Sequence, residues 1–171
     1  WSIGDKSSAI SGLELWLQDN VTDNRVLMLL AQFYLAENRT PEARRTYQSL
    51  DALVPDNAVV LNNLAWLMKD TDVKKGIFYA EKALKKEPDS PFIQDTLAML
   101  LLENGEAERA LKYSEQASKA MPDFLDIQMN YSKVLIANKK NNEAKKLLTI
   151  LLNRESSIDN RKIIRKELRN L

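Results

Sequence analysis

Cysteine and histidine are both absent from this chain of 171 residues. Without cysteine there is no disulfide bond, no thiol nucleophile and no thiolate metal ligand. Without histidine the chain lacks the commonest general base and the commonest metal ligand. A serine–histidine–aspartate triad is therefore impossible.

Glycine is scarce too, with four residues, and no glycine-rich phosphate loop is present. The stretch ENGEAERA, residues 103–110, holds one glycine in an expected helix–helix turn. The pairs Glu106 with Glu108 and Asp70 with Asp72 fall in expected turns, where solvated charge is a more ordinary role than acid–base catalysis. We therefore predict a protein that is not an enzyme and that uses no metal and no cofactor.

The chain has little excess charge and no long hydrophobic run. Its 25 basic and 24 acidic residues give a formal net charge of +1, which does not indicate binding to nucleic acid or to an anionic membrane. No apolar run approaches the roughly 20 residues that span a bilayer. We expect no nucleic-acid partner and no membrane insertion by these residues.

The composition that remains is that of a folded helical protein. Hydrophobic residues make up 44% and charged residues 29%, while aromatic residues are only 7%. Alanine, leucine, lysine and glutamate dominate, and these residues favour helix. The length suits a single domain covering residues 1–171.

Three segments repeat along the chain and align without gaps. They are PDNAVVLNNLAWL from Pro55, PDSPFIQDTLAML from Pro88 and PDFLDIQMNYSKV from Pro122, so the prolines are 33 and 34 residues apart. Such a period indicates stacked supersecondary units. Each Pro-Asp step predicts a boundary between two helices.

A small residue precedes each proline by 12 positions, where two helices can approach closely. These residues are Ala43, Gly76 and Ala110. Together with the period, this pattern resembles the tetratricopeptide repeat, a helix–turn–helix unit of 34 residues. The resemblance implies an all-α, right-handed superhelical solenoid of antiparallel helix pairs, with about ten helices and repeats at 24–57, 58–90, 91–124 and 125–158.

Both ends depart from a whole repeat. In the repeat phase, residues 5–19 match a second helix, with Gly4 in the preceding turn, so we expect a partial repeat at 1–23 and further repeats upstream in a parent chain. Leu13 and Leu17 would then lack a cover. Residues 159–171 form an amphipathic pattern that predicts a C-terminal capping helix.

The resemblance also implies a binding groove. In this family the first helix of each unit lines the concave face, and its second, fifth, sixth, ninth, twelfth and thirteenth residues usually face the groove. Mapped onto this chain, the candidate peptide-groove residues are Arg25, Met28, Gln32, Asn62, Asn63, Trp66, Phe92, Asp95, Met99, Met129, Asn130 and Lys133.

Asparagine amides in such a groove can donate to and accept from an extended peptide backbone. Asn63 and Asn130 share the sixth position, two units apart. The alternative is structural: the amides of Asn62 or Asn63 would bond to a neighbouring helix or cap a turn, and Trp66 would pack under the adjacent repeat. The cationic set by which some members hold a chaperone's C-terminal carboxylates is missing here.

A narrower resemblance concerns the strings GLELWLQDN, RVLMLLAQFYL, VVLNNLAWL and DTLAMLLLENGEAERALKYSEQA. They are similar to the C-terminal repeats of TPR-repeat lipoproteins of PEP-CTERM/exosortase systems. This resemblance implies a bacterial envelope protein of an exopolysaccharide and protein-sorting system, in the periplasm or at the outer membrane; without it, a cytoplasmic location is expected.

Three hypotheses about function follow. The first is a scaffold that binds an extended peptide or protein segment in the concave groove. The second is an architectural segment that stacks on other repeats or self-associates through the open N-terminal helix, with no groove ligand. The third is carbohydrate binding, for which the groove offers only the aromatic residues Trp66 and Phe92.

Overall fold

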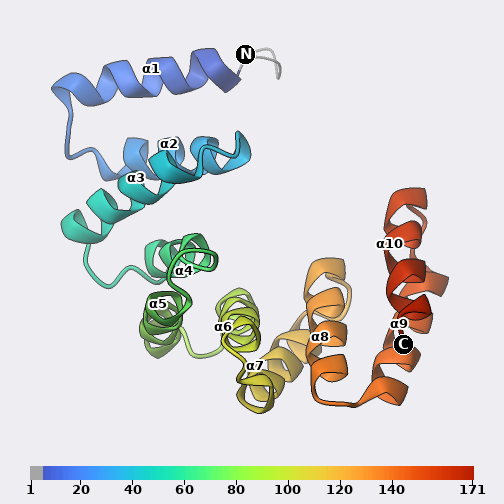
Figure 1. Cartoon of the computed structure of the whole chain (residues 1–171). Coiled ribbons are helices and arrows are strands. Elements are labelled where there is room, and N and C mark those ends of the chain that lie inside the picture. Colours follow the sequence, from blue (N-terminus) through green and yellow to red (C-terminus); the bar gives the residue numbers. More distant parts are fainter. Residues whose placement is uncertain (1–5) are drawn as a thin grey trace.

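The computed structural model describes residues 6–171, and every regular element within them is a helix (Figure 1). The expected all-α fold of about ten helices is confirmed, while the turn expected at Gly4 lies outside the described residues. The helices of the described chain are α1 Lys6–Asp19, α2 Asn24–Ala36, α3 Thr40–Leu53, α4 Ala58–Leu67, α5 Val73–Lys86, α6 Pro91–Glu103, α7 Ala107–Ala120, α8 Leu125–Ala137, α9 Asn141–Arg154 and α10 Ile158–Arg169.

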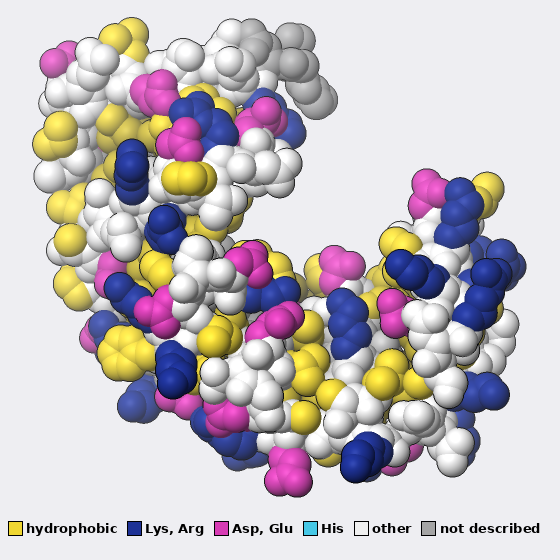
Figure 2. Space-filling model, in the orientation of Figure 1, with side chains coloured by type: hydrophobic (Ala, Val, Ile, Leu, Met, Phe, Trp, Pro, Cys, Tyr) yellow, Lys and Arg dark blue, Asp and Glu magenta, His cyan; other side chains and the backbone are white. Residues whose placement is uncertain are grey.

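The helices form antiparallel pairs that stack into a curve. α2 packs on α3, α4 on α5, α6 on α7 and α8 on α9, and each pair packs on the next. The curve has α1 at one tip and α10 at the other, with a hollow between them (Figures 1 and 2). In addition, α4 contacts α6, and α6 contacts α8, so the first helices of successive pairs lie side by side.

Local chemistry fixes where the helices begin. The carboxylate of Asp23 caps α2 by accepting from the backbone N–H groups of Arg25 (3.1 Å) and Val26 (3.2 Å). The hydrogen bond from Val26 lowers the pKa of Asp23 most, followed by the one that the Trp16 indole N–H donates to Asp23 Oδ2 at 3.2 Å. Asn57 caps α4 in the same way, accepting from Val60 N–H at 3.1 Å.

In three of the four pairs the turn contains one residue in the left-handed region, and the turn from α4 to α5 is the exception. Gly105 has φ +81° between α6 and α7, and Asn38 and Lys139 hold the same place in the turns after α2 and α8, with φ +57° and +60°. Glycine adopts this conformation without steric cost, and asparagine tolerates it better than most residues. The repeat therefore keeps the same backbone geometry in these turns with different residues.

Buried small residues allow the two helices of a pair to touch. A Cβ at Gly76 on α5 would lie 2.9 Å from the backbone oxygen of Ala65 on α4 and 3.1 Å from Leu100 Cδ2. The equivalent positions in the other pairs are fully buried alanines: Ala43, Ala110 and Ala144. The small residues found in the sequence thus lie at the closest helix contacts.

Two buried glutamines join consecutive pairs. Gln128 Nε2 donates to the carbonyl oxygens of Ser118 (2.8 Å) and Met121 (3.0 Å) at the end of α7. Gln94 Nε2, at the same place on α6, donates to Pro88 O at 2.8 Å after α5. Carbonyl groups at a helix end lack intrahelical partners, so these amides satisfy them where water cannot reach.

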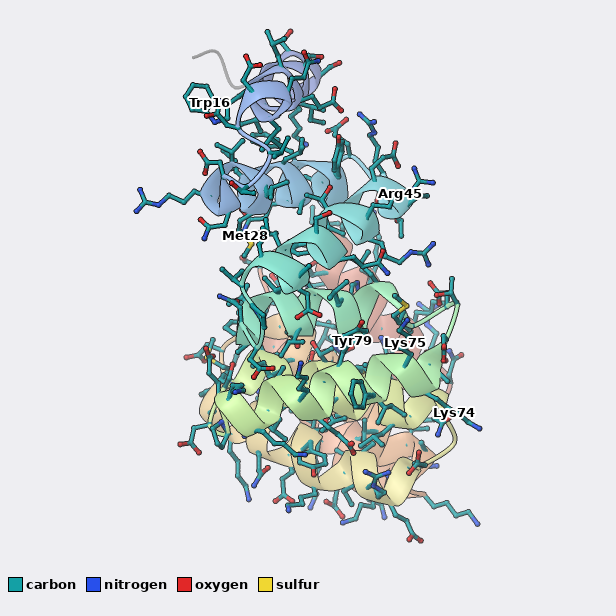
Figure 3. The ribbon with its side chains drawn as sticks, turned by 90° about the vertical axis from the view of Figure 1, so that its left-hand side faces the viewer. Trp16, Met28, Arg45, Lys74, Lys75 and Tyr79 are labelled. Carbon is teal, nitrogen blue, oxygen red and sulfur yellow. The ribbon has the colours of Figure 1, made fainter. Side chains whose placement is uncertain are left out.

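The first helix is better covered than the sequence suggests. Leu13 and Leu17, expected to lie without a cover, are half-buried against the core shared with α2, and Ile10 is 3% exposed. The uncovered apolar side chains of α1 are instead Leu15 and Trp16. Trp16 lies at one edge of the array in Figure 3.

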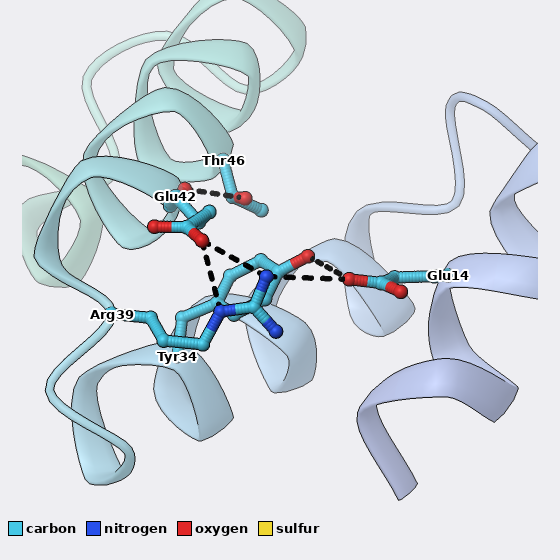
Figure 4. A network of polar contacts seen from close by, with 5 residues as sticks. All are labelled: Glu14, Tyr34, Arg39, Glu42 and Thr46. Carbon is cyan, nitrogen blue, oxygen red and sulfur yellow. Dashed lines mark hydrogen bonds and ion pairs between the residues drawn. The ribbon is translucent and has the colours of Figure 1, made fainter. Parts of the chain in front are cut away.

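A polar network fastens α1 to the rest of the array (Figure 4). Glu14 on α1 accepts a hydrogen bond of 2.6 Å from the Tyr34 hydroxyl on α2. Arg39 stacks 4.6 Å from the centre of the Tyr34 ring and donates from Nε to Glu42 at 2.9 Å. Burial, reinforced by Glu14, raises the pKa of Tyr34 to about 12, so the hydroxyl keeps the proton that it donates.

Candidate functional site

A pocket of about 560 Å³ opens on the inner side of the curve. Its walls come from α4, α6, α8 and α10 and from the residue that precedes α8. The residues that line it are Asn62, Trp66, Phe92, Asp95, Thr96, Phe124, Leu125, Asp126, Ile127, Met129, Asn130, Lys133, Asn160, Ile163, Ile164 and Glu167.

Exposed aromatic side chains form the apolar part of the pocket. Trp66 is 47% exposed, Phe92 49% and Phe124 41%. The rings of Phe92 and Phe124 meet edge to face, with 5.5 Å between their centres. Figure 2 shows hydrophobic side chains among charged ones around the hollow of the curve. Large aromatic surfaces left open in a concave site are typical of protein-binding surfaces.

A short chain of polar contacts crosses the pocket from α6 to α8. Asn130 Nδ2 donates to Asp95 Oδ2 at 2.9 Å, and Lys133 Nζ donates to Asn130 Oδ1 at 3.3 Å. Asp95 Oδ1 and Asn62 Oδ1 are also buried, yet neither accepts a hydrogen bond from the described part of the chain. Buried acceptors without a donor are uncommon in folded proteins and carry a free-energy cost.

The environment of Asp95 changes its acidity. Burial disfavours the carboxylate and raises its pKa to about 6, from an ordinary value of 3.8. The hydrogen bond from Asn130 and the charge of Lys133 act in the opposite direction, and the nearby charge of Asp126 adds to the rise. Asp95 is therefore ionised at neutral pH and titrates just below it.

Seven of the candidate groove residues line this pocket: Asn62, Trp66, Phe92, Asp95, Met129, Asn130 and Lys133. Three others, Arg25, Met28 and Gln32, lie on α2 and do not line it. Met28 is half-buried against the N-terminal core, while Arg25 and Gln32 are exposed.

Two candidates have a structural role in place of an open groove position. Asn63 Nδ2 donates to Val59 O at 2.9 Å within its own helix, a structural role that differs from the expected bond to a neighbouring helix or cap of a turn. Met99 is only 5% exposed and packs in a core cluster with Ala65 and Val134. Its helix, α6, has α4 on one side and α8 on the other, so the ninth position of this unit is covered.

The contribution of α10 to the pocket was not predicted from the sequence. Asn160, Ile163, Ile164 and Glu167 line the pocket, although this segment was expected only to cap the array. A further unit that starts at residue 159, which is 34 residues after the start of the last one, would place them at its second, fifth, sixth and ninth positions. The repeat phase therefore held the signal that could have found them.

The pocket offers polar and aromatic binding groups, and the described residues contain no cluster that could hold a metal ion. Within residues 6–171 no group of three or more His, Cys, Asp or Glu side chains is placed to hold a metal ion. In the same residues no helix combines the length and the hydrophobicity needed to cross a bilayer. Aromatic rings, amides and carboxylates in one concave site suit recognition of another molecule.

Known proteins share this architecture. Residues 101–157 match the family profile of the tetratricopeptide repeat. The chain superimposes on TTC0263, a thermophilic TPR protein of Thermus thermophilus, with a TM-score of 0.79 and 17% identity over 98% of this chain and 92% of that chain. The chain has the tetratricopeptide repeat fold.

Other solved TPR structures agree with this fold. A tetratricopeptide repeat protein of Parabacteroides merdae ATCC 43184 gives a TM-score of 0.83 at 15% identity, covering 98% of this chain and 66% of that one. MamA from Desulfovibrio magneticus RS-1 gives 0.77 at 14% identity, covering 91% of this chain and 89% of that one. The search of curated protein sequences gave no significant match. At these identities the likeness concerns the fold.

Proposed function

We propose that this TPR array is a non-catalytic scaffold that binds an extended segment of another protein in the pocket formed by α4, α6, α8 and α10. The observation that carries the proposal is the joint presence there of open aromatic rings and buried acceptors without donors. An extended segment supplies both apolar side chains and N–H donors, so it complements both features.

Two exposed phenylalanines allow a direct test of this binding surface. Phe92 lies in the pocket on α6, whereas Phe78 on α5 does not line it and is 61% exposed. Each is replaced, in separate variants, by a photo-crosslinking phenylalanine analogue. We expect the Phe92 variant to capture a partner whose crosslinked peptide maps to one continuous segment. Equal capture by the Phe78 variant would contradict groove binding.

For the location, we propose the bacterial envelope, in a system for exopolysaccharide production and protein sorting. The support is the sequence resemblance to the repeats of TPR-repeat lipoproteins. Cell fractionation of the source bacterium, followed by detection of the native protein, tests it. Recovery in the cytoplasmic fraction alone would overturn this proposal and leave the scaffold function untouched.

A second candidate function is architectural, and one specific surface favours it. Leu15, Trp16 and Val21 are 65%, 53% and 68% exposed around α1, and Trp16 lies at the same edge of the array as Met28 in Figure 3. Arg45, Lys74 and Lys75 lie toward the other edge. Under this hypothesis the protein dimerises through the apolar edge. A monomer at high concentration in light scattering, with Trp16→Ala as the comparison, would exclude it.

A further inference from the structure

The groups in the pocket that lack partners are hydrogen-bond acceptors. Asp95 Oδ1 is buried and receives no hydrogen bond from the described chain, although its other oxygen is held by Asn130. Asn62 Oδ1 on α4 is buried in the same state. A ligand that brings donors can satisfy these oxygens once their side chains turn toward the pocket, whereas an added acceptor would leave them without donors.

The charges around these acceptors are mostly negative. Asp95, Asp126 and Glu167 line the pocket from α6, α8 and α10. Within the described chain Lys133 is the only cation that lines it, and its Nζ is bonded to Asn130. The electrostatic environment therefore favours a cation and disfavours an anion.

The aromatic rings beside these carboxylates suit the same kind of ligand. Trp66 and Phe92 are half-exposed, and Phe92 is braced edge to face by Phe124. Aromatic faces attract cationic heads, and apolar surface covers the methylene stem of a long basic side chain. The neighbouring Lys69 already places its Nζ 5.3 Å from the centre of the Trp66 ring.

We propose that the pocket takes a lysine or arginine side chain of the bound protein segment, with its cationic head against Asp95 and its stem against Phe92 and Trp66. The inference rests on the proposed function and names the chemistry of its ligand. The cation lies against the carboxylate of Asp95, whose buried oxygen Oδ1 lacks a donor within the described chain, and compensates the cost of burying this charge. The rest of the segment lies over the apolar part of the pocket.

The acidity of Asp95 supports this assignment. Its pKa is raised because the buried carboxylate has too little compensation from Asn130 and Lys133, with Asp126 opposing them. An added cation would lower this pKa, and linkage then requires that a basic ligand binds more tightly as Asp95 ionises. The other polar residues that line the same pocket are Asn62 on α4, Thr96 on α6, and Asn160 and Glu167 on α10.

The test starts from a phage-displayed library of random peptides selected on the whole 171-residue protein. We expect enrichment of peptides with a lysine or arginine next to aliphatic residues. Fluorescence anisotropy then compares one selected peptide with its Lys→Met analogue on the native protein and on Asp95→Asn. The Asp95→Asn substitution should reduce the affinity for the basic peptide about tenfold or more and change the affinity for the Lys→Met analogue little.

Controls separate the pocket from general charge. Asp126→Asn removes an exposed carboxylate of the same pocket and should reduce the affinity for the basic peptide less than about fivefold. Circular dichroism of each variant must show native helicity.

Two results of the selection would contradict the proposals. Selection of neutral or acidic peptides that bind in the groove of the native protein and of Asp95→Asn with equal affinity would overturn the proposal of a basic side chain. The scaffold function would still stand. Failure to select any peptide whose binding is lost in Phe92→Ala would overturn the groove function itself.

Discussion

The backbone oxygen of Ala65 on α4 lies only 2.9 Å from the point where a Cβ at Gly76 on α5 would begin. The two helices of this pair are therefore as close as a glycine allows. Leu100 Cδ2 on α6 closes the same space at 3.1 Å. The contact thus joins one pair to the next as well as the two helices to each other.

Gly76→Ala is expected to destabilise the protein by about 1–3 kcal/mol, because the methyl group forces α5 away from α4. The matched control is Gly12→Ala on α1, where an added Cβ meets nothing within 4 Å. That change should stabilise by about 0.5–1 kcal/mol, since alanine is the better helix residue. Urea unfolding measures both; two changes of the same sign would contradict the packing described here.

Gln128→Met keeps the length of the side chain and removes its amide. The carbonyl groups of Ser118 and Met121 then lose their buried donor, so we expect a loss of about 2–3 kcal/mol in the free energy of unfolding. Gln116→Met on the exposed side of α7 is the control and should change stability by less than about 0.5 kcal/mol. Thermal unfolding of the two variants checks this prediction, and equal losses would refute it.

Asp95→Asn should stabilise the unliganded protein at pH 7. The raised pKa, about 6 against 3.8, means that the folded state binds more protons than the unfolded state between these values, so stability falls as pH rises through this window. Removing the charge should therefore add roughly 1–3 kcal/mol at pH 7 and nothing below about pH 4. Melting curves of both proteins at the two pH values test it; a less stable variant at pH 7 would contradict the burial cost.

The affinity for a basic peptide should follow the same titration in the opposite direction. Between about pH 5 and pH 7 Asp95 ionises, so binding of the lysine peptide should strengthen with pH. The Asp95→Asn variant should lose most of this dependence. Anisotropy titrations at several pH values measure it, and an identical pH profile in the variant would rule out Asp95 as the source.

Tyr34→Phe removes the hydroxyl group on α2 that donates a hydrogen bond to Glu14 on α1. We expect a loss of about 1 kcal/mol and faster amide hydrogen exchange confined to α1, because this bond and the stacked Arg39 hold that helix. Gln18→Ala on the exposed face of α1 serves as the control. Exchange that accelerates throughout the array would show that the hydroxyl has a wider role.

The repeat phase made much of this structure predictable. The prolines and the small residues indicated the helix pairs, and counting along each unit placed Trp66, Phe92, Asp95 and Asn130 in one groove. Counting along the unit also placed Met99 in the groove, but the neighbouring helices bury this residue. The sequence pattern of one helix does not tell how closely its neighbours pack against it. The count also placed Asn63 in the groove, whereas the amide of this residue donates to the backbone of its own helix.

The pocket itself required the three-dimensional arrangement. Its walls are four helices that lie far apart along the chain, and the angle between successive pairs decides whether α10 faces α4. Contacts such as the one at Gly76 and the buried amide of Gln128 join consecutive pairs. The sequence shows these residues, but it does not show how far each helix pair is rotated relative to the next.

The position of α10 has a consequence for how the array comes apart. In a stack held together by contacts between neighbours, the last helix is free to detach without disturbing the rest. Here it also forms a wall of a pocket that reaches back to α4. A segment bound across that pocket would contact α10 and α4 at the same time and so connect the end of the chain to its middle. The helices from α4 onward would then melt as one cooperative unit, and fraying of the tail would set the rate at which the ligand leaves.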